Sequence, residues 1–207
     1  MSELFTMMQD YVTPNSTVID IGANVGNVSR AFAELVGQVI AFEPQPDVFR
    51  LLQSSVPENV RAEKLAVGAQ NGDVSFFLDK RAGMKGVASS QMILEDLEAM
   101  NLIEEIQVRC VTLDHYVQSH DLAPDFIKID VEGCEPDVFV GGWNTIEEYR
   151  PTMFFEFWEN HISRYEEWFR RLSAIYKLTR VPGGEEVTEY YRANQGEGNI
   201  DILCRRK

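Results

Sequence analysis

The segment Val18–Gly26 constrains the fold of this chain more than any other. It reads V-I-D-I-G-A-N-V-G, an apolar run that carries one acid and leads into a turn of small residues. Apolar residues at helical spacing follow the turn, so we expect a strand at Thr17–Ile21 and a helix at Val25–Leu35. The segment therefore predicts a buried strand, a tight turn and a helix N-terminus in direct succession.

The same strand–helix alternation continues through most of the chain. Helices are predicted at Asp47–Ser55 and from Glu135, and further strands at Gln38–Phe42, Val60–Val67, Phe126–Val131, Thr152–Phe157, Tyr176–Arg180 and Ile200–Cys204. Strands that alternate with helices at this spacing predict a parallel α/β sheet, here with a closing antiparallel pair. We predict one domain over residues 1–207, with an N-terminal helix over 1–16, a polar β/α insertion over 68–112 and a long loop over 182–198.

The acidic composition excludes some classes of function. The formal net charge is −14, and phosphate binding depends on basic surface, so we do not expect a nucleic-acid partner. Three cysteines without metal-type spacing predict neither a disulfide framework nor a zinc site. There is no long apolar run and no signal-peptide pattern, so we expect a cytoplasmic protein that does not bind a membrane. The sequence leaves open the oligomeric state and whether the chain is a unit of a longer polypeptide.

Two acids near the ends of neighbouring strands indicate the ligand. A dinucleotide fingerprint requires a second glycine where this chain has Asn24, and the acid before Gly22 would repel a pyrophosphate but attract an ammonium group. Glu43 follows the second strand, where a carboxylate can accept both hydroxyls of a ribose. The small apolar residues Leu65–Gly68 suit the edge of an adenine. An ammonium, a ribose and an adenine without phosphate describe S-adenosylmethionine, although Asp20 taken alone also fits a turn or helix cap.

Four segments resemble the FkbM-type family of S-adenosylmethionine-dependent methyltransferases. They are Val18–Gly26, Ile40–Pro44 (I-A-F-E-P), Phe126–Gly133 (F-I-K-I-D-V-E-G) and Arg150–Glu156 (R-P-T-M-F-F-E). The resemblance implies a Rossmann-like, seven-stranded class I methyltransferase sheet in the order 3-2-1-4-5-7-6, flanked by helices. It also implies O-methylation of a hydroxyl, typically on a sugar, a glycan or another small molecule, but it leaves the acceptor pocket unspecified. From its own residues, we expect the loop over 182–198 on the acceptor side.

The cofactor contacts combine motif match with position at the strand ends. They are expected at Asp20, Gly22, Asn24, Gly26, Glu43, Val67 and Asp130. Two other functions share the predicted fold. One is N-methylation of a small amine, which the acidic surface would attract, and the other is a nucleoside-binding module without catalysis.

The catalytic candidates lie on and beyond the fourth and fifth predicted strands. Lys128, Asp130 and Glu132 share one face of the fourth strand because side chains alternate, and Glu156 and His161 follow the fifth strand. A neutral hydroxyl must lose its proton during methyl transfer, which requires a base or a metal ion. One hypothesis is that Asp130, Glu132 and Glu156, with His161, bind Mg²⁺ or another divalent cation. The other is that Asp130 or His161 acts directly as the base.

Purely structural interpretations compete with these roles. Lys128 and Glu156 could form a partly buried ion pair between adjacent strands. Glu132 could cap the helix that begins near Glu135. His161 could be an ordinary residue of a loop or helix start. The sequence therefore predicts the methyl donor and leaves open which residue is the base and what the acceptor is.

Overall fold

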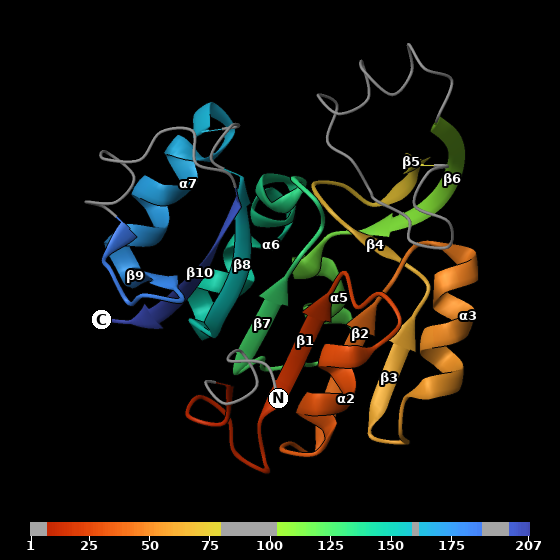
Figure 1. The fold of residues 1–207 in the computed structure, drawn as a ribbon, viewed down its shortest axis with the longest axis horizontal. Coiled ribbons are helices and arrows are strands. Elements are labelled where there is room, and N and C mark those ends of the chain that lie inside the picture. Colours follow the sequence, from red (N-terminus) through yellow and green to blue (C-terminus); the bar gives the residue numbers. More distant parts are fainter. Residues whose placement is uncertain (1–7, 80–102, 159–161, 188–198) are drawn as a thin grey trace.

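The computed structural model describes residues 8–79, 103–158, 162–187 and 199–207, arranged as a twisted central sheet between two layers of helices (Figure 1). Its strands are β1 (Thr17–Ile21), β2 (Gln38–Phe42), β3 (Val60–Glu63), β7 (Phe126–Ile129), β8 (Thr152–Trp158), β9 (Tyr176–Val181) and β10 (Asn199–Arg206). They lie in the order β3-β2-β1-β7-β8-β10-β9, which reads 3-2-1-4-5-7-6 when only this sheet is numbered. The first five strands of this order are parallel, and β10 runs antiparallel to both β8 and β9.

The side chains of the central strands alternate between two buried layers. Val18 and Val39 point to one face and pack with α2 (Asn27–Ala33) and α3 (Pro46–Ser55). Ile19 and Ile40 point to the other face and pack with α5 (Leu113–Ser119), α6 (Glu135–Tyr149) and α7 (Ile162–Ile175). Both faces of β1 and β2 are therefore covered, which explains why these strands are almost continuously apolar.

A second, smaller sheet stands beyond the carboxyl ends of the first strands. It contains β4 (Ala66–Val67), β5 (Gly72–Asp79) and β6 (Ile103–Val111) in the order β4-β6-β5. The strand predicted at Val60–Val67 is therefore divided, because β3 pairs with β2 whereas β4 leaves the central sheet and pairs with β6. The α/β class with a mainly parallel sheet is confirmed. In detail, the described strands divide between two sheets. The helix predicted at Val25–Leu35 begins only at Asn27, because Asn24 and Gly26 have left-handed backbone conformations.

Several expectations fall wholly or partly outside the described residues. They concern residues 1–7 of the N-terminal helix predicted over 1–16, the interior of the insertion and most of the loop over 182–198. Residues 9–16, which are described, form turns and irregular chain. Within the described part of the chain, no helix is long and apolar enough to cross a membrane.

Candidate active site

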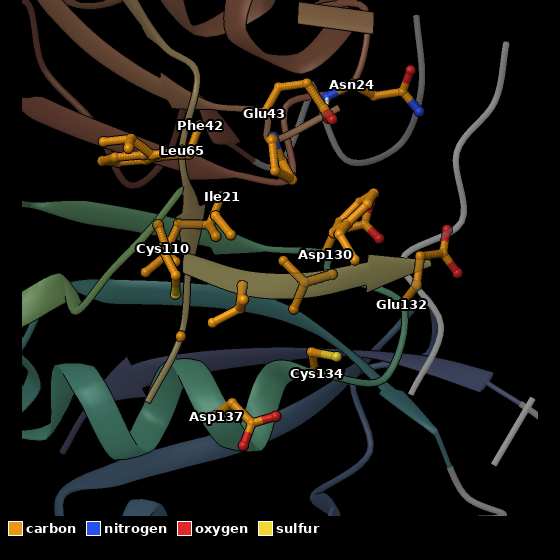
Figure 2. Close-up of a pocket in the computed structure, with 18 of the residues that line it drawn as sticks. Ile21, Asn24, Phe42, Glu43, Leu65, Cys110, Asp130, Glu132, Cys134 and Asp137 are labelled. Carbon is orange, nitrogen blue, oxygen red and sulfur yellow. Dashed lines mark hydrogen bonds between the residues drawn. The ribbon is translucent and has the colours of Figure 1, made fainter. Parts of the chain in front are cut away.

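A cavity of about 280 Å³ opens at the carboxyl ends of β1, β2 and β7 (Figure 2). The second sheet forms its opposite wall. The lining residues are Ile21, Gly22, Asn24, Phe42, Glu43, Pro44, Leu65, Ala66, Val67, Gly68, Val74, Ser75, Phe76, Cys110, Asp130, Val131, Glu132, Cys134 and Asp137. Ligands of open α/β sheets bind at this edge, so the cavity is the candidate active site.

The turn after β1 can only be built with glycine at its first position. Gly22 has a φ of +79°, and a Cβ atom there would lie 1.8 Å from the carbonyl oxygen of Asp130. The N–H groups of Gly22 and Ala23 both donate to the carbonyl oxygen of Phe42, which ties the turn to β2. Gly26 serves a different purpose, because a Cβ atom there would meet Leu52 of α3 at 2.7 Å and the residue does not line the cavity.

Glu43 reaches the cavity wall as the sequence predicted. One of its carboxylate oxygens accepts a hydrogen bond from the N–H of Asn24 (3.1 Å) and the other from the N–H of Gln45 (2.9 Å). Burial raises the pKa of Glu43, whereas these two N–H groups and the charge of Lys128 oppose the shift. Figure 2 shows Glu43 and Asn24 side by side at one end of the cavity.

Asp20 lies elsewhere than the sequence suggested. Its side chain is fully buried and is not part of the cavity lining. It accepts a hydrogen bond from Ser29 Oγ (2.5 Å) and faces Lys128 Nζ at 3.2 Å. In this structure the carboxylate that should meet an ammonium group of the ligand meets the ammonium group of a lysine.

Lys128 connects three parts of the site. Its buried ammonium group contacts Asp20 (3.2 Å) and Asp130 (3.3 Å) and donates a hydrogen bond to the carbonyl oxygen of Gly22 (2.9 Å). Burial favours the neutral form, but the two carboxylates outweigh burial and raise the pKa of Lys128. Lys128 therefore stays charged and holds the glycine turn against β7.

The middle of the cavity is apolar, and the second sheet supplies much of it. Leu65, Ala66 and Val67, the segment for which an adenine edge was predicted, line this part. Val74 and Phe76 of β5 in the same sheet also line it, which sequence reasoning missed. The alternation of apolar residues along β5 is the signal that could have shown one face turned inward.

Three carboxylates stand in a row across adjacent strands. Ile129 of β7 pairs with Phe155 of β8, so Asp130 and Glu156 are the next residues along each strand. Glu156 in turn lies directly opposite Asp201 of β10. Neighbouring strands are about 5 Å apart, so the row extends about 10 Å outward from the cavity.

Two carboxyl groups in and beside this row, those of Asp201 and Glu132, have raised pKa values. Burial raises the pKa of Glu132 to about 7, and the charges of Asp130, Glu156 and Glu135 add to the shift. Burial likewise raises the pKa of Asp201 to about 6, with Glu156 and Asp130 contributing. Glu156 and Asp201 also line a second cavity of about 190 Å³ with Arg180, Val181, Pro182 and Ile200. Sequence reasoning missed Asp201, whose only signal is an acid inside an apolar closing strand.

The expected metal site and helix cap take other forms. No group of three or more His, Cys, Asp or Glu side chains in the described ranges is arranged to hold a metal ion. Asp130, Glu132 and Glu156 therefore do not fit a metal site as they stand, and His161 lies outside the described residues. The N-cap of α6 is Cys134 rather than Glu132, which instead lines the cavity. Burial raises the pKa of Cys134 to about 12, so its thiol is protonated at neutral pH.

Comparison with known proteins identifies the family. Residues 20–192 match the family model described as the methyltransferase FkbM domain. The chain belongs to the FkbM methyltransferase family. The 2-O-methyltransferase NoeI of Sinorhizobium fredii is 28% identical over 204 residues, which cover 93% of this chain and 80% of NoeI. The hexuronic acid methyltransferase AglP of Haloferax volcanii is 24% identical over 149 residues, which cover 70% of this chain and 57% of AglP.

Solved structures show the same fold at low sequence identity. Methyltransferase FkbM from Methylobacillus flagellatus superposes with a TM-score of 0.61 at 14% identity, over 94% of this chain and 44% of that protein. An rRNA methylase from Streptococcus thermophilus gives a TM-score of 0.56 at 11% identity, over 98% and 93% of the two chains. This FkbM chain thus spans less than half of the Methylobacillus protein and a little over half of AglP.

Proposed function

We propose that this FkbM-family chain transfers a methyl group from S-adenosylmethionine to a hydroxyl of a sugar or glycan. The observation that carries the proposal is the order of polar and apolar side chains along one cavity. A held carboxylate (Glu43) lies at one end, apolar side chains lie in the middle, and Asp130 and Glu132 lie where the carboxylate row begins. The sheet order, with one antiparallel strand inserted next to the edge, and the names of the relatives NoeI and AglP support it.

The donor half of the cavity suits an adenosine without phosphate. Glu43 would accept the ribose hydroxyls, since each of its oxygens keeps a lone pair beyond its backbone hydrogen bond. Val67 and Phe76, which both line the cavity, would contact the adenine. Gly22 lets the turn pack directly against the backbone of Asp130, and Asp20 would act through Lys128 and the turn rather than by contact. When bound, S-adenosylmethionine supplies an electrophilic methyl group on a sulfonium.

The acceptor half suits a hydroxylated ring. Ionised carboxylates accept hydrogen bonds from hydroxyls, so Glu156 and Asp201, which line the second cavity, would orient the sugar. In-line transfer requires the acceptor oxygen to be held about 3–3.5 Å from the methyl carbon. We assign the base to Glu132, because a pKa of about 7 balances basicity against ionisation at neutral pH, whereas Asp130 is paired with Lys128.

A divalent cation is the second route to a more acidic hydroxyl. The two routes differ in one measurement, which is turnover in excess chelator after dialysis. Full turnover supports Glu132 as a direct base. Loss of turnover that Mg²⁺ restores would support a metal-assisted step.

Donor binding can be tested without knowing the acceptor. Titration calorimetry with S-adenosylmethionine should show binding that falls at least about tenfold in Glu43→Gln, since two charge-assisted hydrogen bonds are weakened. Glu58→Gln is the matched control because Glu58 is exposed and does not line the cavity. Equal affinity in both variants would contradict the donor assignment.

The acceptor can be found by a screen read by mass spectrometry. Neutral glycosides, uronic acids and small amines are offered with the donor, and one added methyl group is scored. Methylated glycosides support the proposal. Methylated amines alone would favour N-methylation, and donor binding without transfer to any acceptor would favour a nucleoside-binding module.

A further inference from the structure

One buried carboxylate holds the loop that carries Glu132. Glu135 Oε1 accepts hydrogen bonds from the N–H of Val131 (3.0 Å) and from the N–H of Gly133 (3.2 Å). These are the two amides on either side of Glu132. Glu135 Oε2 accepts a hydrogen bond from the hydroxyl of Tyr165 on α7 (2.5 Å), and the Glu135 side chain is fully buried.

Glu135 and its partners on α7, which together we call the clamp, hold a backbone segment that has an uncommon conformation at Glu132. Glu132 has a φ of +55°, and Gly133 follows with a φ of +91°. A left-handed conformation is uncommon for a residue with a side chain and persists only where its surroundings hold it. A second contact from α7 provides further support, because Arg164 Nη1 donates to the carbonyl oxygen of Gly133 (2.7 Å).

The two α7 residues thus help to hold the N–H and the carbonyl oxygen of Gly133. Tyr165 acts through Glu135, and Arg164 acts directly and also contacts Asp137 at 3.3 Å. Asp130 and Glu132 both line the cavity, and Figure 2 shows the Glu132 side chain beyond that of Asp130. Without the clamp, nothing in the loop sequence would favour a left-handed conformation at Glu132 over an extended one.

We propose that Glu135 is a positioning residue, which, with Tyr165 and Arg164 of α7, holds Glu132 in its left-handed conformation and thereby aims its carboxylate at the acceptor hydroxyl. This inference rests on the assignment of Glu132 as the base in the proposed function. It gives α7 a role in catalysis although no residue of α7 is among the described residues that line the cavity. Glu135 itself touches neither ligand.

The alternative is that Glu135 only stabilises the start of α6. Asp114 provides a matched control for that role. Its carboxylate also anchors α6 through backbone amides, accepting from the N–H of Thr145 (2.7 Å) and of Asn144 (3.3 Å), but it does not line the cavity. Asp114→Ala and Glu135→Ala therefore both remove a carboxylate that holds two backbone amides.

The experiment compares kcat, acceptor KM, donor Kd and urea stability in these variants of the full chain. We expect Glu135→Ala to lower kcat about 100-fold, as a misplacement of about 1 Å can, with donor Kd within about twofold of the unmodified enzyme. Glu135→Gln should recover kcat to within about tenfold, because its amide oxygen can still accept from both amides. Asp114→Ala should lose stability but keep kcat within about twofold.

A milder variant covers the case in which Glu135→Ala does not fold. Tyr165→Phe combined with Arg164→Ala removes both α7 contacts and leaves the Glu135 amide contacts in place. Its kcat should fall about tenfold at unchanged donor Kd. If this double variant keeps full kcat, and Glu135→Ala does so wherever it folds, while Glu132→Gln is inactive, the positioning role is wrong. If Glu132→Gln is itself fully active, the base assignment fails instead.

Discussion

The triple contact of Lys128 leads to a strong prediction about stability. Lys128→Met keeps the length and apolar stem of the side chain but removes the ammonium group. Asp20 would then be a fully buried carboxylate whose remaining partner is Ser29. The carbonyl oxygen of Gly22 would also lose its hydrogen bond.

The expected magnitude follows from the burial of each partner. Asp130 is 45% exposed, so the loss of its ion pair costs at most about 1 kcal/mol. Asp20 has no such access to water, and breaking a buried pair by removing one partner costs about 3–5 kcal/mol. We therefore expect Lys128→Met to lower the free energy of unfolding by about 4 kcal/mol, and the melting temperature by about 10 °C for a chain of this length.

Urea unfolding at pH 7 measures this loss, with the transition slope checked for constancy. Adding Asp20→Asn to Lys128→Met removes the unpaired charge while the side-chain oxygen can still accept from Ser29, so we expect about 2 kcal/mol to be recovered. Lys177→Met, at an exposed position of β9, should change the stability by less than about 0.5 kcal/mol. A loss below about 1 kcal/mol in Lys128→Met, or a double variant less stable than the single, would refute this account of the buried pair.

Three shorter predictions concern the cavity. Gly22→Ala should lower the free energy of unfolding by about 2–5 kcal/mol and abolish donor binding in calorimetry, because the new Cβ would meet the carbonyl oxygen of Asp130. Gly184 is the control, since it has a similar φ of +76° and, among the described residues, no atom within 4 Å of the Cβ position. Gly184→Ala should lower the free energy of unfolding by only about 1–2 kcal/mol. The raised pKa of Glu132, about 7 against an ordinary 4.5, means that the native state binds more protons than the unfolded state between these values, so stability falls as pH rises through this window. Glu132→Gln should therefore be more stable than the unmodified protein by about 1–3 kcal/mol at pH 8 but not at pH 4 in urea unfolding. Asp201→Asn should raise acceptor KM about tenfold and leave donor Kd unchanged, and a change in donor Kd alone would contradict its place in the acceptor half.

The sequence predicted those residues of the cavity wall whose location follows from their position at the end of a strand. Glu43 directly follows a short apolar strand, so it necessarily emerges at the carboxyl edge of a parallel sheet. Val67 was predicted for the same reason, and it lines the cavity although its strand belongs to the second sheet. Both predictions were made from the end of an apolar strand and from the rule that ligands bind at the carboxyl ends of parallel strands.

Other residues required information that a local pattern does not contain. Asp20 is placed by the strand register, which sets it opposite Lys128, and by the reach of that lysine across the sheet. Asp201 depends on which residues of β10 lie opposite β8, and an antiparallel register cannot be derived from one strand. Glu135 appeared only as an acid at a helix start, because its contacts with the preceding loop depend on a turn with left-handed residues.

The carboxylates of Asp130 and Glu132, which line the cavity, also affect what happens after methyl transfer. The proposed donor carries a positive sulfonium, and the spent donor is neutral at sulfur. Opposite charges attract in proportion to their product, so carboxylates at Asp130 and Glu132 favour the charged donor over the neutral product. The carboxylates that would prepare the acceptor would therefore also lower the affinity for the spent donor. After each turnover the cavity would bind a new S-adenosylmethionine molecule more tightly than the product.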